Sequence, residues 1–320
     1  MKTSSAPGKL VLAGEYAVLD GHAAWVTAVD RRAVVKHDLV PASSTSLRVS
    51  SHSRAEQSLD DDVDDGFFDL VRAVVQQSSL SVSGVLHVDT RDMEREEKLG
   101  VGSSAAVAAA IAHALLSTTT ATPKVDDVHA LAHAAHLAFS SGKGSGIDVA
   151  AACYGGCVAF KKGPPIVVQA APLDVTGVDV LVVFTGHSQS TRAFVQKVQE
   201  HQQAHPEAHD DVVAQLSAAA QKAMACKKPE ELFAAIDDAA GAMNRLGDVA
   251  GIDIVSQPHQ NIIDIAHRHG GAAKPSGAGG GDVALAFVPS DVVGRARAEL
   301  TSAGFDVIDV ELGAPGVGRP

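Results

Sequence analysis

Apolar positions in the first half of the chain follow a strand-like pattern and then a helical one. Short β-prone runs separated by Gly or Asp predict strands at residues 10–13, 24–29, 33–35 and 80–88. Alanine-rich or amphipathic stretches predict helices at 66–77, 105–116, 125–139 and 147–152, followed by strands at 158–161 and 166–169. The Ser-rich polar segment 41–65 ends in an acidic cluster, which predicts a solvated loop with an Asp at the start of the next helix.

The second half has longer helical segments and fewer strands. An unbroken apolar run predicts a buried strand at 178–184. Helices are expected at 191–203, 210–227, 229–242 and 259–269, and the chain closes as β-α-β at 284–288, 290–303 and 306–310. We therefore divide the chain into an N-terminal domain of residues 1–174 and a C-terminal domain of residues 175–320.

The composition limits the classes of function. The 320 residues carry 26 Lys and Arg against 38 Asp and Glu, a net charge of −12, so the chain lacks the basic face of a nucleic-acid-binding protein. Any anionic ligand must be held by a local device. No apolar run reaches the ~20 residues of a membrane span, and no signal peptide is evident. Three cysteines without a C-x-x-C pair argue against a disulfide framework, so we expect a cytoplasmic protein.

A glycine- and serine-rich loop precedes the first alanine-rich helix. Gly100 and Gly102 let backbone N–H groups converge on an anion, and the positive end of the following helix points to the same place. Ser103 and Ser104 add hydroxyls that can bind phosphate or magnesium. The loop also has the spacing G-x-G-x-x-A of a dinucleotide site, but the highly charged segment 91–98 precedes it where that site needs a buried strand. A plain glycine-containing helix start is the alternative.

Residues 274–282 form another glycine-rich loop, with four glycines in the five positions 277–281. Each glycine costs conformational entropy on folding, so this density predicts that the backbone approaches a ligand closely. The sequence contains no G-x-x-x-x-G-K-[ST] and neither H-R-D nor D-F-G. These absences exclude a Walker-type phosphate loop and a protein kinase.

Two charged residues stand beside the loops. Lys9 begins the first buried strand, where it is either a surface residue or, next to phosphate loops, a neutraliser of negative charge. Asp148 follows a Gly-Ser-Gly segment at the start of an apolar helix, where it either caps the helix or serves as a catalytic carboxylate. The residue patterns leave both alternatives open.

Histidines recur at helical spacing in two places. The two sets are His129, His133 and His136, and His201, His205 and His209. Such a face can bind a metal ion, but the neighbouring residues supply no further ligand. We therefore expect both sets to form solvated helix faces.

Three motifs occur in a fixed order along the chain. They are Pro7-Gly8-Lys9, Gly100-Val101-Gly102-Ser103-Ser104-Ala105-Ala106 and Ser276-Gly277-Ala278-Gly279-Gly280-Gly281. Together they resemble the GHMP kinase family of small-molecule kinases, over residues 6–288. The resemblance implies an α+β fold with an α/β N-terminal domain, a ferredoxin-like C-terminal domain and an active site in the cleft between them.

Within that family, the details are similar to the phosphomevalonate kinase branch. Mevalonate kinases do not share the segment 184–191 in this form, and they usually carry another glycine in place of Asp282. The resemblance implies ATP- and Mg²⁺-dependent phosphorylation of (R)-5-phosphomevalonate to 5-diphosphomevalonate, in the mevalonate route to isoprenoids. The alternatives are a mevalonate kinase, another small-molecule kinase of the family, or a non-catalytic nucleotide-binding regulator on the same scaffold. We expect a small-molecule substrate, no nucleic-acid or membrane partner, and a monomer or homodimer.

The resemblance also assigns roles to single residues. Lys9, Lys98 and Asp148 line the transfer site. The residues assigned to the ATP phosphates are Gly100, Val101, Gly102, Ser103, Ser104, Ala105 and Ala106, and Ser104 reaches Mg²⁺. The residues assigned to the substrate are Lys9, Ser145, Gly146, Ser190, Thr191, Arg192, Ser276, Gly277, Ala278 and Gly279. Mevalonate kinases carry a magnesium-binding Glu eleven residues before the catalytic Asp, and this chain has Leu137 there, which leaves the metal shell incompletely assigned.

Overall fold

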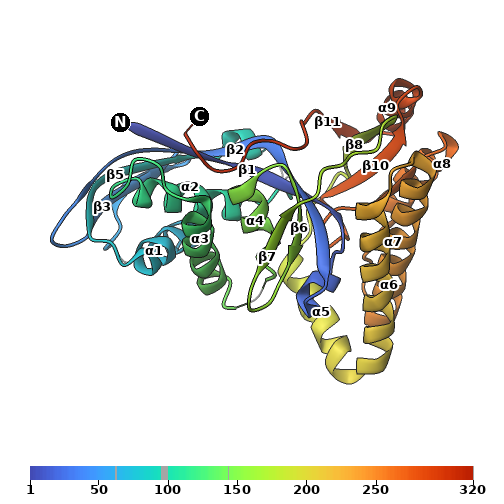
Figure 1. The fold of residues 1–320 in the computed structure, drawn as a ribbon, viewed down its shortest axis with the longest axis horizontal. Coiled ribbons are helices and arrows are strands. Elements are labelled where there is room, and N and C mark those ends of the chain that lie inside the picture. Colours follow the sequence, from blue (N-terminus) through green and yellow to red (C-terminus); the bar gives the residue numbers. More distant parts are fainter. Residues whose placement is uncertain (62, 95–99, 143, 320) are drawn as a thin grey trace.

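The computed structural model describes residues 1–61, 63–94, 100–142 and 144–319. In this part of the chain the strands form one seven-stranded and one four-stranded sheet. Figure 1 shows the two sheets in two halves of an elongated molecule, each with its own helices.

The long strand β2 is the spine of the first sheet. The strands of this sheet are β1 (Lys2–Ala13), β2 (Ala23–Pro41), β3 (Ser46–Ser51), β4 (Arg54–Ser58), β5 (Val82–Asp89), β6 (Cys157–Lys161) and β7 (Val167–Ala170). The order is β4-β3-β5-β2-β6-β7, and β1 pairs with β2 in antiparallel register over nearly its whole length. β5 pairs with the end of β2 and β6 with its beginning, so β2 connects the two sides of the sheet.

Four helices belong to this half in the described residues. They are α1 (Gly66–Ser78), α2 (Ser103–Leu116), α3 (Val125–Phe139) and α4 (Ile147–Tyr154), with short 3₁₀ turns at η1 (Ala17–Asp20) and η2 (Arg91–Met93). Helix α2 lies between β1 and β2 on one side and α1, α3 and α4 on the other, and residues 105–115 are buried all round. Alanine suits this position because small side chains let neighbouring elements approach α2 closely, and a helix apolar on all faces is stable only inside the core.

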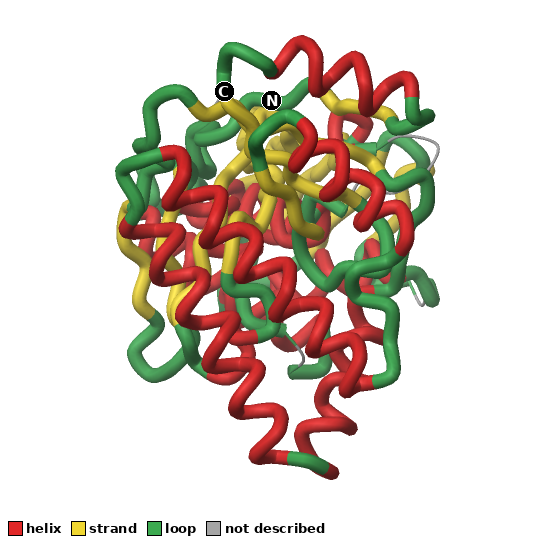
Figure 2. Tube along the Cα trace, turned by 90° about the vertical axis from the view of Figure 1, so that its right-hand side faces the viewer, coloured by secondary structure: helices red, strands yellow, loops and turns green. Residues whose placement is uncertain are grey.

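The second half has the order of a ferredoxin-like fold. Its strands are β8 (Val178–Phe184), β9 (Ala272–Pro275), β10 (Val283–Pro289) and β11 (Asp306–Ile308), arranged β11-β8-β10-β9 with antiparallel pairing throughout. The helices are α5 (Thr191–Ala204), α6 (Pro206–Ala225), α7 (Pro229–Ala250), α8 (Gln257–Arg268) and α9 (Val293–Ser302). In Figure 2 the long helices of this half lie in front of the strands.

The C-terminal segment returns to the first sheet. Gly318 bridges to Ser5, and Leu312 bridges to Val29. The two chain ends accordingly lie close together in Figure 1. The segment ties the end of the second half to the strands of the first, while the domain boundary placed at residues 174–175 stays a prediction.

The structure confirms the α+β class and the ferredoxin-like second half, but it corrects three local predictions. The polar segment 41–65 is not only a loop, because β3 and β4 form a hairpin at the sheet edge, where the residues of β4 are half-buried or exposed and mostly polar. Strand β1 begins earlier than predicted because Ser4 and Ser5 are buried despite being polar. Strand β9 lies inside the predicted glycine-rich loop. The predicted helix-start Asp is confirmed, since Asp65 accepts a 2.7 Å hydrogen bond from the Phe67 N–H.

The prediction of solvated histidine faces is wrong for His129 and His209, which are buried, whereas His205 is exposed. His129 is 7% exposed, and its ring stacks edge-on against Tyr154 of α4. His209 is 2% exposed and hydrogen-bonds the Asp20 carboxylate at 2.9 Å. The His129 ring thus packs against α4 and the His209 ring contacts η1. The spacing of histidines along one helix does not show such contacts with other elements. Within the described residues no helix is both long and apolar enough to cross a membrane.

Candidate active site

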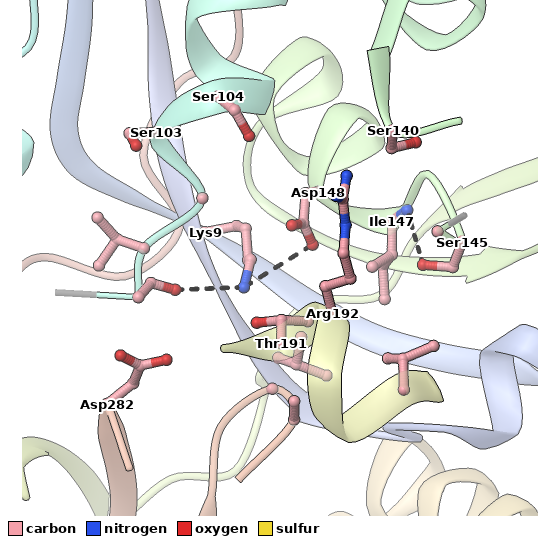
Figure 3. A pocket seen from close by; sticks show the side chains of 18 of the residues that line it. Lys9, Ser103, Ser104, Ser140, Ser145, Ile147, Asp148, Thr191, Arg192 and Asp282 are labelled. Atoms are coloured by element: carbon pink, nitrogen blue, oxygen red, sulfur yellow. Dashed lines mark hydrogen bonds and ion pairs between the residues drawn. The ribbon is translucent and has the colours of Figure 1, made fainter. Parts of the chain in front are cut away.

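A cleft of about 780 Å³ lies where the two halves meet. Its walls come from β1, the starts of α2, α4 and α5, and the loop between β9 and β10. Figure 3 shows the polar side chains of these segments facing one another across the opening.

The starts of three helices border this cleft. Gly102 precedes α2 and Gly146 precedes α4, both in the left-handed conformation and without a side-chain hydrogen bond to the helix end. Ser190 caps α5, with its hydroxyl accepting a hydrogen bond from the Ala193 N–H. The N-terminus of a helix carries free N–H groups and partial positive charge. An acidic chain thus has a local device for holding anions.

Glycine is required in the loop before α2. A Cβ at Gly102 would lie 3.1 Å from Cε of Lys9, and the φ of Gly102 is +76°, a conformation that favours glycine. A Cβ at Gly100 would lie 2.8 Å from Cβ of Asp282. The loop therefore sits against both side chains with only its backbone.

Lys9 occupies the middle of the cleft and is 7% exposed. Its Nζ lies 3.7 Å from Oδ1 of Asp148 and donates a 3.4 Å hydrogen bond to the carbonyl of Gly100. The backbone N–H of Lys9 also donates to the carbonyl of Val101 at 2.8 Å. Lys9 is therefore buried in the cleft rather than a surface residue, and Asp148 faces it instead of capping α4.

Ser104 in the first turn of α2 has a histidine partner. Its Oγ lies 3.0 Å from Nε2 of His136, which comes from α3 and also lines the cleft. Burial lowers the pKa of His136, and the negative charge of Asp148 partly offsets this by raising it. A neutral imidazole can accept the Ser104 O–H and leave the oxygen lone pairs directed to the cleft.

A buried ion pair joins the two halves behind the cleft. Lys274 of β9 is fully buried, and its Nζ hydrogen-bonds Oε1 of Glu15 at 2.5 Å. Burial lowers the pKa of Lys274, while the charge of Glu15 acts in the opposite direction. The other carboxylate oxygen of Glu15 is buried without a hydrogen-bond partner. Glu15 also lines the cleft.

Two hydroxyl groups attach the β9–β10 loop to the first half. The Oγ of Ser276 accepts from the N–H of Val11 at 2.9 Å and donates to its carbonyl at 3.0 Å. The Tyr16 hydroxyl donates to the carbonyl of Ala278. The Ser276 hydroxyl, assigned to the substrate by resemblance, thus binds the backbone of β1.

The glycine density of this loop serves mainly protein packing. A Cβ at Gly279 would lie 2.3 Å from the Ile254 carbonyl, one at Gly280 would enter the Phe194 ring, and one at Gly281 would lie 2.8 Å from the His187 carbonyl. A Cβ at Gly277 would meet nothing within 4 Å, and Gly277 lines the cleft. Protein packing thus accounts for three of the four glycines, and the close approach of a ligand to this loop stays a prediction.

The structure gathers most of the predicted site residues in the cleft. Those that line it are Lys9, Gly100, Val101, Gly102, Ser103, Ser104, Ser145, Gly146, Asp148, Ser190, Thr191, Arg192, Ser276, Gly277 and Ala278. Ala105 and Ala106 have their side chains in the core instead. Gly279 packs against Ile254 outside the lining, and Lys98 lies outside the described residues.

Several residues of the lining were not assigned a site role from the sequence. Among them are Glu15, His136 and Asp282. Glu15 was missed because its role follows from the burial of Lys274, which needs a carboxylate partner. No sequence signal shows that Lys274 is buried. His136 was hidden in a histidine series interpreted as solvated. Burial raises the pKa of Asp282, opposed by hydrogen bonds from Gln189 and Ser188.

The described residues contain no cluster of three or more His, Cys, Asp or Glu side chains suited to a metal ion. The cleft does contain a hydroxyl at Ser104 and a carboxylate at Asp148, which are oxygen donors of the kind that magnesium takes. Magnesium commonly binds through one or two protein oxygens together with substrate phosphates. The donor set therefore fits a magnesium ion brought in with a nucleotide.

Comparison with protein families finds two matching models. Residues 70–156 match the model of the GHMP kinases N terminal domain, and residues 230–306 match that of the GHMP kinases C terminal domain. The first match includes the loop before α2 and Asp148, and the second includes the β9–β10 loop. Both matched regions thus contribute to the cleft.

Whole-length relatives carry two different names. The chain is 29% identical to the phosphomevalonate kinase of a Streptomyces species, covering 89% of each chain. It is 26% identical to the mevalonate kinase of Thermococcus sibiricus, covering 95% of this chain and 94% of the other. Among solved structures, Streptococcus pneumoniae phosphomevalonate kinase in complex with phosphomevalonate and AMPPNP has a TM-score of 0.79 at 19% identity, covering 98% of this chain and all of that one.

Proposed function

The chain belongs to the GHMP kinase family, and from this premise we propose that it transfers the γ-phosphate of ATP to (R)-5-phosphomevalonate, forming 5-diphosphomevalonate. The reaction joins two anions, so its main physical difficulty is electrostatic. Transfer to a phosphate needs no strong base, because a phosphate monoester with a second pKa near ~6 is already largely ionised at neutral pH.

The observation that carries this proposal is the concentration of positive groups on the acceptor side of the cleft. Lys9 stands in the middle, and Arg192 extends into the cleft from the first turn of α5 in Figure 3. The N-termini of α4 and α5 face the same space. In a chain of net charge −12, two cationic side chains and two helix N-termini gathered at one place favour an acceptor that is itself an anion.

The nucleotide side has a separate set of groups. In this proposal the backbone of residues 100–102 and the start of α2 hold the β- and γ-phosphates, as helix N-termini do for anions. Magnesium, when bound, neutralises charge on these phosphates. Ser104 and Asp148 are the residues that would hold it. Lys9 donates to the transferring phosphate, and Asp148 keeps the ammonium group in position.

The relatives named phosphomevalonate kinase support this acceptor, and so does the geometry of the described lining. Cationic side chains in that lining are Lys9, Arg54 and Arg192. Arg54 is engaged by Asp65 at 2.7 Å and lies over the Phe67 ring, which leaves Lys9 and Arg192 for the acceptor phosphate.

Mevalonate is the second candidate acceptor, and Asp148 favours it. A carboxylate 3.7 Å from the Lys9 ammonium can serve as the base that an alcohol acceptor needs. The relatives named mevalonate kinase support this alternative as well. In that case Arg192 contributes little to acceptor binding.

A coupled ADP-release assay with Mg·ATP tests the proposal directly. We expect ADP release with 5-phosphomevalonate and not with mevalonate. Arg192→Gln should raise the KM for phosphomevalonate at least tenfold and leave the KM for ATP within twofold. Arg245→Gln, an exposed arginine on α7 outside the cleft, is the matched control and should change neither value.

ADP release with mevalonate alone would overturn the proposal in favour of the second candidate. ATP binding without release in the presence of either acceptor would instead support the nucleotide-binding regulator. Calorimetry with AMPPNP distinguishes this last outcome from a protein that has simply lost its fold.

A further inference from the structure

Asp282 connects two segments that are distant in sequence. Its backbone carbonyl accepts hydrogen bonds from both the N–H and the hydroxyl of Thr185, each at 2.9 Å. Its backbone N–H donates to the carbonyl of His187 at 2.8 Å. The main chain of Asp282 thus fixes the segment that leads from β8 into α5.

The carboxylate of Asp282 continues this attachment. It accepts hydrogen bonds from the backbone N–H of Gln189 and the hydroxyl of Ser188. These two residues immediately precede Ser190, the cap of α5. The carboxylate therefore holds the stretch of chain on which the position of the α5 N-terminus depends.

Neighbouring contacts make the junction tighter. The ring N–H of His187 donates to the Gly280 carbonyl at 2.8 Å, and Gly280 packs against Phe194 of α5. Asp282 also touches Gly100 of the phosphate loop. The phosphate loop, the segment between β8 and α5, and the β9–β10 loop therefore meet at Asp282, although they are far apart in the sequence.

The backbone conformation of Asp282 is one that glycine adopts more easily. Its φ is +57°, and Asn, Asp and Gly are the residues most often found there. The backbone alone would therefore favour glycine at this position, and what aspartate adds is the carboxylate that holds residues 188 and 189.

We infer that Asp282 is a positioning residue for acceptor binding, which fixes residues 185–190 so that α5 presents Ser190, Thr191 and Arg192 to the acceptor. The inference rests on the proposed function only in naming phosphomevalonate as that acceptor. It gives Asp282 no contact with the transferred phosphate. Asp282 is accordingly distinct from a magnesium ligand, although it lines the same cleft.

Asp282→Gly is the informative substitution. It removes the carboxylate, and it relieves the positive φ rather than straining it. Asp282→Asn keeps one acceptor oxygen in place of two and should have an intermediate effect. Ser79→Gly is the matched control, because Ser79 has a φ of +53° at the exposed end of α1, away from the cleft.

The wild-type protein is first assayed with phosphomevalonate and mevalonate, and the variants are then compared on the acceptor that it uses. We expect Asp282→Gly to raise the KM for that acceptor at least tenfold, while the Kd for Mg·AMPPNP measured by calorimetry stays within twofold. Amide hydrogen exchange in residues 185–192 should become at least fivefold faster. Ser79→Gly should match the wild type in all three measurements.

The inference would be overturned if Asp282→Gly bound AMPPNP tenfold more weakly than the wild type with magnesium present and equally well without it. That result would identify Asp282 as a metal ligand. An unchanged acceptor KM, or unchanged exchange in residues 185–192, would overturn it as well. Use of mevalonate by the wild-type protein would refute the proposed function alone, because the comparison of variants is then made with mevalonate. If neither acceptor is used, the proposed function fails. Amide hydrogen exchange in residues 185–192 and the Kd for Mg·AMPPNP then still decide whether Asp282 is a positioning residue.

Discussion

Lys9 and Asp148 have unequal tasks in the cleft. The Lys9 ammonium is nearly buried and lies between the Gly100 carbonyl and the Asp148 carboxylate. Asp148 is more open, with its side chain 36% exposed. An acceptor that is already ionised needs the positive charge more than it needs a base.

Lys9→Met should therefore reduce kcat more than Asp148→Asn does. Loss of a group that stabilises transition-state charge costs about 10²–10³-fold in kcat. We expect Asp148→Asn to cost less than about 10²-fold, since it loosens the position of Lys9 without removing it. Steady-state kinetics with saturating Mg·ATP measure both values, and equal losses would identify Asp148 as the general base.

The buried pair of Lys274 and Glu15 gives a prediction about stability. Lys274→Met leaves the Glu15 carboxylate buried without its counter-charge, which costs about 3–5 kcal/mol. Adding Glu15→Gln should recover part of this loss. Urea denaturation followed by circular dichroism measures it.

The exposed pair of Lys222 and Asp238, 2.8 Å apart, is the control for that experiment. Lys222→Met should cost less than about 1 kcal/mol, as exposed ion pairs do. A similar cost for the buried and the exposed pair would contradict the role assigned to Lys274.

At the scale of elements, the hydrogen bond between Ser104 and His136 ties the start of α2 to α3. Both residues line the cleft, and the link lies next to the predicted phosphate loop. The position of the Ser104 hydroxyl therefore depends on a second helix as well as on its own.

His136→Leu should weaken nucleotide binding several-fold, because Ser104 loses its partner. His136→Gln should largely preserve it, since the Gln amide can occupy the place of Nε2. Calorimetry with Mg·AMPPNP is the measurement. Equal weakening in both variants would mean that His136 acts by packing alone.

Sequence patterns located most elements because the buried faces were strongly apolar, as in β8 and α3. They missed the hairpin of β3 and β4, whose outer strand is polar because it lies at an exposed edge. They also missed β9, which is short and contains Pro275. In these places the tertiary environment, rather than local preference, determines the strand.

The motifs located the cleft but not its internal partners. Lys9, Gly102 and Asp148 were expected there, and all three line it. The contacts of His136 with Ser104, of Lys274 with Glu15 and of Asp282 with Gln189 could not be predicted. Each joins residues brought together only by folding, and a single sequence does not record such pairings.

At the scale of the whole molecule, several buried histidines make stability depend on pH. Burial lowers the pKa of His37, His129 and His259 to about 4. Histidine in an unfolded chain has a pKa near ~6.5. Between these values the unfolded state binds more protons than the folded state, so stability falls as the pH falls.

The free energy of unfolding should therefore decrease from pH 6.5 to about pH 4, by up to about 3 kcal/mol for each such histidine. His37→Gln should make this dependence shallower. Urea titrations across this pH range measure the slope, and a stability independent of pH would contradict the neutral state of the buried rings.

The central claim is that the acceptor is a phosphate rather than an alcohol. Phosphorus NMR of the product formed from Mg·ATP and each acceptor tests it most directly, because it identifies the new bond. We predict two mutually coupled signals of a diphosphate ester from 5-phosphomevalonate, and no new signal from mevalonate. A new monoester signal from mevalonate, with phosphomevalonate left unchanged, would contradict the claim.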